Sequence, residues 1–63
     1  MTEYALEIYN DGTDKFVTQV DVYSTLKEAE QSMMEMPHIT GCYYGITMIE
    51  YDQDGNEINV ERL

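Results

Sequence analysis

The sequence is poor in cysteine, in positive charge and in long apolar runs. It has one cysteine, one proline, no tryptophan, and three lysine or arginine residues against thirteen aspartate or glutamate residues. One cysteine cannot form an intramolecular disulfide, so we expect a reducing compartment, the cytoplasm. No run approaches the roughly 20 apolar residues of a membrane-spanning helix, and no basic segment precedes an apolar stretch, so we expect neither a membrane span nor a signal peptide.

The charge imbalance gives a formal net charge of −10 at pH 7. Phosphate groups repel a surface of this sign, which argues against direct binding of nucleic acid or of an anionic membrane. A hydrophobic content of 43% argues against disorder. The length suits one small domain, residues 1–63, near the lower limit at which an apolar core suffices without metals or disulfides.

The first part of the chain predicts a β-hairpin. Apolar and polar residues alternate over residues 3–9, which is typical of a half-buried strand, and Asn10-Asp11-Gly12 interrupts the pattern. A three-residue loop with Gly12 at positive φ would pair Leu6 with Phe16. The second strand is then expected over residues 15–23. Its inward side chains would be Phe16, Val20 and Val22.

One helix is predicted between this hairpin and the next. Thr25, with Glu28 three residues later, fits a capping box, and Ser24 is equally suited as the cap. Pro37 ends the helix because it removes an N–H and restricts the residue before it. Four apolar residues recur at helical spacing and define the buried stripe: Leu26, Ala29, Met33 and Met36.

A second hairpin completes the chain. We expect a strand over residues 42–51, a turn at Gln53-Asp54-Gly55 and a final strand over residues 57–62. This turn would pair Tyr51 with Glu57 and Met48 with Val60.

The element order ββαββ predicts an α+β fold, a two-layer domain with a four-stranded antiparallel sheet and one helix on one face. The first and third strands are the most apolar, so we place them centrally, in the spatial order 2-1-3-4. The alternative topology sets the second strand beside the third, in parallel. Charged residues on the second and fourth strands would discourage pairing at the sheet edges.

One helix leaves the second sheet face without a cover, and this open face is the candidate binding surface. Tyrosines there alternate with carboxylates, and tyrosine is enriched in protein interfaces. These side chains either shield the small sheet from solvent or form a binding surface for a partner or a second copy. The candidate partner-binding residues are Glu3, Glu7, Tyr9, Asp21, Tyr23, Tyr43, Ile49, Tyr51, Glu57 and Glu61.

The carboxylates allow two interpretations. They either keep the protein in solution or provide a single-sign field that attracts a strongly basic partner, such as the nucleic-acid-binding groove of an enzyme. In small size, acidity and compact α+β layout, the chain resembles the small phage or mobile-element proteins that disarm bacterial defence, including anti-CRISPR and anti-restriction DNA mimics. The resemblance rests on size and charge, and no motif carries it. It implies an inhibitor, acting in the host bacterial cytoplasm, that blocks the nucleic-acid site of a nuclease or effector.

No residue pattern predicts catalysis, a cofactor or a metal site. His38 and Cys42 lie four residues apart across a loop with Gly41, so they could come within reach of each other, but a domain this small has little room for a catalytic pocket. A loop histidine and a half-buried structural thiol are the simpler interpretation. Residues 52–57 superficially match a calcium loop, but Gly55 falls at the fourth position and strands flank it, so a hairpin turn is expected. We therefore expect a non-enzymatic inhibitor of a basic partner. The alternative is a homo-oligomeric accessory or structural domain, a homodimer for example, that associates through its tyrosine face.

Overall fold

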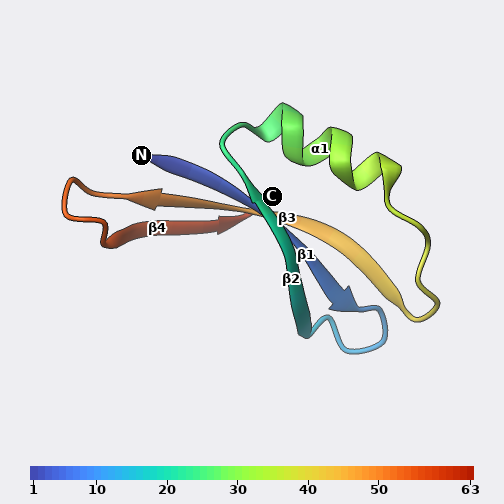
Figure 1. Cartoon of the computed structure of the whole chain (residues 1–63). Helices are drawn as coiled ribbons and strands as arrows, with labels where there is room; N and C mark the ends of the chain where they lie inside the picture. The colour runs from blue at the N-terminus through green and yellow to red at the C-terminus, as the bar shows by residue number, and fades with distance from the viewer.

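The computed structural model describes residues 1–63 and contains four strands and one helix (Figure 1). The strands form one antiparallel sheet in the order β2-β1-β3-β4, which confirms the predicted α+β fold and its strand order. The elements are β1 (Thr2–Asn10), β2 (Phe16–Tyr23), α1 (Leu26–Glu35), β3 (Cys42–Tyr51) and β4 (Glu57–Arg62).

The helix begins at the predicted capping box. The Thr25 hydroxyl accepts a hydrogen bond from the Glu28 backbone N–H at 3.2 Å and donates to the Glu28 carboxylate at 2.9 Å. Ser24 donates to the same carboxylate at 3.1 Å but does not cap a backbone N–H. Met36, just before Pro37, has extended backbone dihedrals and ends the helix.

The core lies between α1 and the central strands. Leu6, Ala29 and Ile46 are its buried members, and the predicted stripe residues Met33 and Met36 pack against them. Leu26, which was also predicted for the buried stripe, is instead exposed at the start of the helix. The helix packs on β1, β2 and β3 but not on β4. Only six of the 63 side chains are buried, so much of the sheet is left without a second layer. No helix has the length and apolar character needed to cross a bilayer.

The register predicted for the first hairpin is wrong. Residues 11–15 form a longer loop, in which the Asn10 side chain accepts hydrogen bonds from the N–H groups of Gly12 and Thr13 at 2.9 and 3.1 Å. Asp14, and not Gly12, has the positive φ, at 58°. Aspartate tolerates the left-handed region better than most residues, so the turn can close two residues later than the glycine suggested.

The longer loop and two register shifts change the faces of β2. Phe16 pairs with Tyr9 rather than Leu6, and Val22 pairs with Ala5, so both lie on the open face instead of in the core. Tyr23 pairs with Tyr4 and faces the helix. Val20 packs against the core as predicted.

The second hairpin follows the prediction at its turn and departs from it along the strand. Gly55 has a φ of 84°, and Tyr51 pairs with Glu57 as expected. A register shift beside Tyr51 then pairs Ile49 with Val60 and Met48 with Glu61. Because a slip of one residue exchanges the two faces of a strand, Glu61 leaves the open face and Arg62 takes a place on it.

The molecule is elongated, with extents of 39 × 24 × 15 Å. Its radius of gyration is 12.3 Å, against about 11 Å for a compact domain of this length. In Figure 1 the turn between β3 and β4 points away from the helix, so that the end of the β3–β4 hairpin stands outside the helix-covered part of the sheet. That hairpin end exposes both of its faces.

Candidate partner-binding surface

The open face of the sheet consists of two chemically different parts. Near the first hairpin, Tyr9 pairs with both Phe16 and Tyr43. At the other end, Glu3 pairs with Ile49, and Tyr51 pairs with Glu57. Between them lie Ala5 and Thr47, which are buried.

The first part is an aromatic cluster closed by a cation. The Tyr9 and Tyr43 rings stack with centroids 5.6 Å apart, and Phe16 meets Tyr9 edge-on at 6.1 Å. The Arg62 guanidinium carbon lies 3.6 Å from the Tyr9 ring centroid. Gly45 lets the Tyr9 ring lie directly on β3, since a Cβ there would stand only 2.9 Å from Tyr9 Cε2. We call Tyr9, Phe16, Tyr43 and Arg62 the Arg62 cluster.

Both tyrosine hydroxyls of the Arg62 cluster are hydrogen-bonded to carboxylates. The Arg62 guanidinium donates to the Tyr43 hydroxyl, which donates to the Asp14 carboxylate at 2.8 Å. The Tyr9 hydroxyl donates to the Glu7 carboxylate at 2.5 Å, and the Thr47 hydroxyl donates to the same carboxylate. Burial raises the pKa of Tyr9, and the hydrogen bond to Glu7 raises it further.

These contacts leave few polar groups of the Arg62 cluster free to bind a partner. Tyr9 is only 6% exposed, and both tyrosine hydroxyls already donate within the chain. The Tyr9 ring and both tyrosine hydroxyls are therefore occupied by contacts within the chain, whereas Phe16 is 56% exposed. Sequence reasoning missed Arg62, because its position depends on the one-residue shift in β4 that the turn sequence does not reveal.

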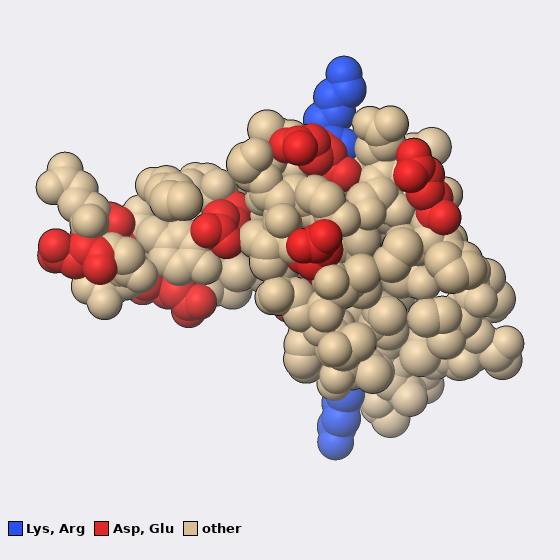
Figure 2. All heavy atoms as spheres, in the orientation of Figure 1, with Lys and Arg blue, Asp and Glu red and all other residues tan.

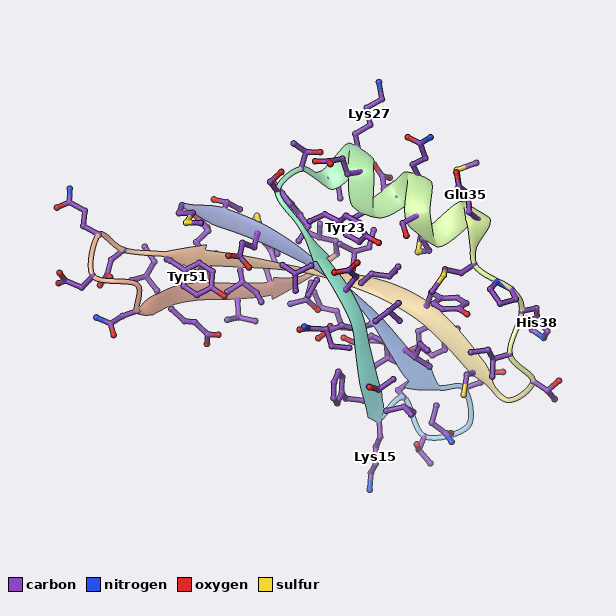
Figure 3. The ribbon with its side chains drawn as sticks, in the orientation of Figure 1. Lys15, Tyr23, Lys27, Glu35, His38 and Tyr51 are labelled. Atoms are coloured by element: carbon purple, nitrogen blue, oxygen red, sulfur yellow. The ribbon has the colours of Figure 1, made fainter.

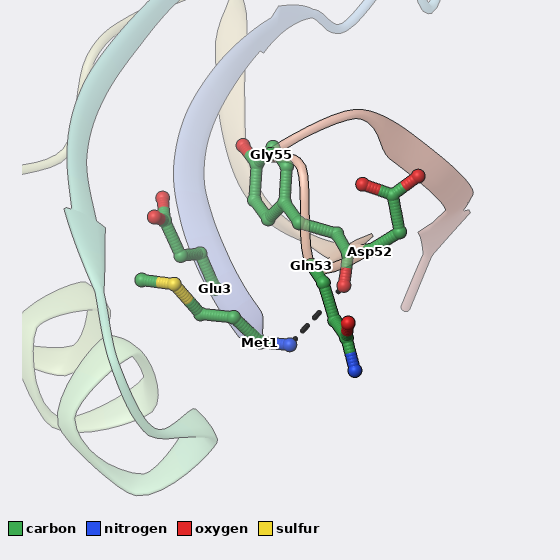
Figure 4. A pocket seen from close by; sticks show the side chains of 6 residues that line it. Met1, Glu3, Asp52, Gln53 and Gly55 are labelled. Carbon is green, nitrogen blue, oxygen red and sulfur yellow. Dashed lines mark hydrogen bonds between the residues drawn. The ribbon is translucent and has the colours of Figure 1, made fainter.

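The second part of the open face lies on the protruding hairpin end. We call Glu3, Tyr51, Asp52, Asp54 and Glu57 the distal acidic surface. Three of these residues, with Met1, Gln53 and Gly55, line an open hollow of about 690 Å³ (Figure 4). The chain start is fixed there by two backbone contacts, since Tyr51 N–H donates to the Met1 carbonyl at 2.8 Å and the Met1 amino group donates to the Tyr51 carbonyl at 3.2 Å.

Tyr51 lies near two negatively charged side chains, Glu3 and Glu57. Partial burial raises the pKa of Tyr51, and the neighbouring carboxylates of Glu3 and Glu57 raise it further because they disfavour a phenolate. The ring therefore presents a neutral, amphipathic surface inside a negative field. A cationic side chain would meet both a carboxylate and an aromatic face at this place.

The Asp52 side chain bridges the backbone of the turn beyond Tyr51. Its carboxylate accepts hydrogen bonds from the N–H groups of Asp54 and Asn56 at 2.9 and 3.0 Å. The hydrogen bond from the Asn56 backbone is the main reason that the pKa of Asp52 is lowered. This turn keeps Asp54 at the exposed end of the hairpin.

The few cations lie away from the distal acidic surface. Figure 3 shows Lys27 on the helix side and Lys15 at the far end of the first hairpin, both distant from Tyr51. In Figure 2 the protruding hairpin carries acidic atoms and no basic ones. Arg62 is exposed but lies over the Tyr9 ring, so none of the three lysine and arginine side chains lies at this end of the molecule.

Three of the candidate partner-binding residues do not lie on the open face of the sheet. Tyr23 faces the helix, where its hydroxyl lies 2.6 Å from that of Ser32. Asp21 pairs with the core residue Leu6 at a register shift, and its carboxylate accepts from the Val22 N–H at 2.8 Å. Glu61 pairs with Met48 on the helix side of the sheet. The other seven candidates lie on the open face: Glu3, Glu7, Tyr9, Tyr43, Ile49, Tyr51 and Glu57.

The loop before β3 holds the two residues considered for a catalytic dyad. His38 is exposed, and Cys42 is a half-buried free thiol at the start of β3. No group of three or more histidine, cysteine, aspartate or glutamate side chains is arranged to hold a metal ion. Comparison with protein-family models, curated proteins and solved structures found no match for the chain.

Proposed function

We propose that the protein is a non-enzymatic inhibitor that places its distal acidic surface against a basic, nucleic-acid-binding surface of a partner, such as a bacterial defence nuclease. The single observation that carries the proposal is the protruding hairpin end, where Glu3, Tyr51 and Glu57 lie together and the only positive group is the Met1 amino group, with no lysine or arginine side chain beside them.

The arrangement suits a cationic groove for two reasons. The hairpin end extends from a molecule only 15 Å across its thinnest direction, which allows entry into a groove. Its carboxylates would meet the arginine and lysine side chains that otherwise bind phosphates, while Tyr51 and Ile49 would add apolar contact. The net charge of −10 would also speed the encounter with a basic partner.

The test is affinity capture from a bacterial lysate with the tagged protein, followed by challenge with duplex DNA and, separately, with high salt. The proposal expects a basic nucleic-acid-binding enzyme that is retained at low salt and displaced by DNA, because both ligands would occupy one surface. A captured protein that resists both challenges would contradict the electrostatic mechanism.

Two matched variants locate the contact. The distal variant carries Glu3→Gln, Asp54→Asn and Glu57→Gln, and the control variant carries Asp11→Asn, Glu30→Gln and Glu35→Gln. Each removes three negative charges, and all six positions lie on the surface outside the core. The proposal expects the distal variant to lose binding by at least about tenfold and the control variant to keep most of it. Equal losses would mean that net charge alone, and not this surface, governs binding.

A further inference from the structure

We propose that the outer edge of β4 binds an extended, cationic segment of the partner as a fifth strand of the sheet. The inference rests on the proposed function and deepens it, because it states the form in which the basic partner is bound. Strand addition supplies affinity through backbone hydrogen bonds, and alternate side chains supply specificity.

The sheet has two free edges, and one is more regular than the other. The β2 edge contains two register shifts, opposite Leu6/Glu7 and opposite Ile8/Tyr9. Such irregularities are a common way to prevent another strand from pairing. The β4 strand has one shift, beside Tyr51, and pairs without interruption from Asn59 to Arg62. The β4 edge is therefore the one able to accept a strand, and its charged residues, which we expected to discourage pairing, would restrict it to a strand of complementary charge.

The backbone of β4 offers unpaired groups in a regular order. The Leu63 N–H donates to the Ile46 carbonyl of β3 at 2.9 Å. Since successive residues of a strand direct their backbone groups to opposite sides, Arg62 and Val60 direct theirs away from β3. No strand lies beyond β4 in the sheet. Val60 and Arg62 thus present donors and acceptors to an incoming chain.

The side chains beside this edge define the occupant. Val60 is 56% exposed and Ile58 64% exposed, and the helix does not pack on β4. Glu61 stands on the opposite sheet face from Val60, on the side of Glu50. A strand with small or β-branched residues against Val60 and lysine or arginine against Glu61 would match both faces. A second copy, with its own net charge of −10, is disfavoured.

The probe is a peptide of alternating lysine and threonine, compared with the same peptide N-methylated along its backbone. N-methylation keeps the side chains and charge but removes the N–H donors that strand pairing needs. We expect the unmethylated peptide to bind the full chain at least about tenfold more tightly by calorimetry. We also expect slower amide exchange at Val60 and Arg62 on binding, with little change at Glu61, whose N–H faces β3.

Each outcome separates this inference from the proposed function. Equal binding of the two peptides, or no binding of either, overturns strand addition. If the two peptides bind equally and the distal variant still weakens both, the electrostatic surface stands without the added strand. If neither the distal variant nor Glu61→Gln weakens the unmethylated peptide relative to Glu30→Gln, the acidic contact itself fails. Protection of the Val60 and Arg62 amides in the free protein, with a dimeric mass in sedimentation, would assign the edge to a second copy and overturn the proposal.

Discussion

The guanidinium carbon of Arg62 lies 3.6 Å from the ring centroid of Tyr9 and fixes the last strand to the first. Arg62 is the last residue of β4, and Tyr9 lies near the end of β1. Because β3 separates these strands in the sheet, the contact crosses over Gly45, whose missing side chain makes room for the Tyr9 ring. One of the three cations of the chain is therefore committed to the fold.

Replacing Arg62 tests this commitment. Arg62→Gln should lower both the thermal midpoint and the urea midpoint, because it removes the cation from the Tyr9 ring and the donor to the Tyr43 hydroxyl. Arg62→Lys should lose less, since it keeps the charge but not the planar group. Lys15→Gln is the matched control, because this substitution removes the same charge from an exposed residue outside the Arg62 cluster. Equal effects of Arg62→Gln and Lys15→Gln would contradict the assignment.

Gly45 should not tolerate a larger side chain. In Gly45→Ala the new Cβ would lie 2.9 Å from Tyr9 Cε2 and 3.3 Å from Cδ2, so the ring must move out of its stack. We expect a loss of about 1–3 kcal/mol in the free energy of urea unfolding. Gly12→Ala serves as the control, because its Cβ would meet only the Asn10 side chain at 3.4 Å. Its effect should stay within about 0.5 kcal/mol. If Tyr9→Ala does not reduce the cost of Gly45→Ala, the clash with Tyr9 is not its cause.

The helix cap gives an independent test of the local structure. Thr25→Ala should cost about 1 kcal/mol, because the Glu28 N–H loses its acceptor. Ser24→Ala should cost clearly less, since Ser24 contacts only the Glu28 carboxylate. Urea unfolding followed by circular dichroism measures both. A larger loss for Ser24→Ala than for Thr25→Ala would show that Ser24, and not Thr25, is the N-cap.

The elements, their order and most of their bounds were predictable from local patterns. Alternation identified the strands, Thr25 with Glu28 identified the start of the helix, and Gly55 identified the second turn. These features depend on residues close together in the chain, whose geometry a few side chains decide.

The faces of the edge strands were not predictable in the same way. The position of Phe16 depends on Asp14 taking the left-handed conformation, and that of Arg62 depends on one register shift near Tyr51. Both are settled by packing across the sheet rather than by the turn sequence. The Arg62 cluster follows from them, so sequence reasoning found its tyrosines but not its cation.

The depressed pKa of Asp52 predicts a loss of stability in acid. The hydrogen bond from the Asn56 backbone lowers the pKa below its ordinary value of 3.8, so the ionised form stabilises the folded state above that value. This contribution is lost as the pH falls through the depressed pKa. Asp52→Asn keeps an acceptor oxygen without the titration. Its stability relative to the parent chain, from urea unfolding, should therefore improve as the pH falls below about 4. A difference that does not vary with pH would contradict the hydrogen-bonded turn.

Burial is the main reason that the pKa of Tyr51 is raised, and the carboxylates of Glu3 and Glu57 on the distal acidic surface raise it further. Combined Glu3→Gln and Glu57→Gln should lower this pKa toward 10.0, because the two carboxylates disfavour the phenolate. The pKa can be followed by NMR of the labelled tyrosine ring. Glu30→Gln with Glu35→Gln, on the helix, should leave it unchanged. If Glu3→Gln with Glu57→Gln left the Tyr51 pKa unchanged, the two carboxylates would not lie close enough to act on Tyr51.

The most direct test of the central claim is the affinity of the captured partner for the distal variant and for the control variant, measured at low salt. The two variants have the same net charge and differ only in where three carboxylates were removed. The account predicts that the distal variant binds at least about tenfold more weakly than the control variant and no longer competes with DNA. Equal affinities, or a greater loss in the control variant, would show that the distal acidic surface is not the binding site.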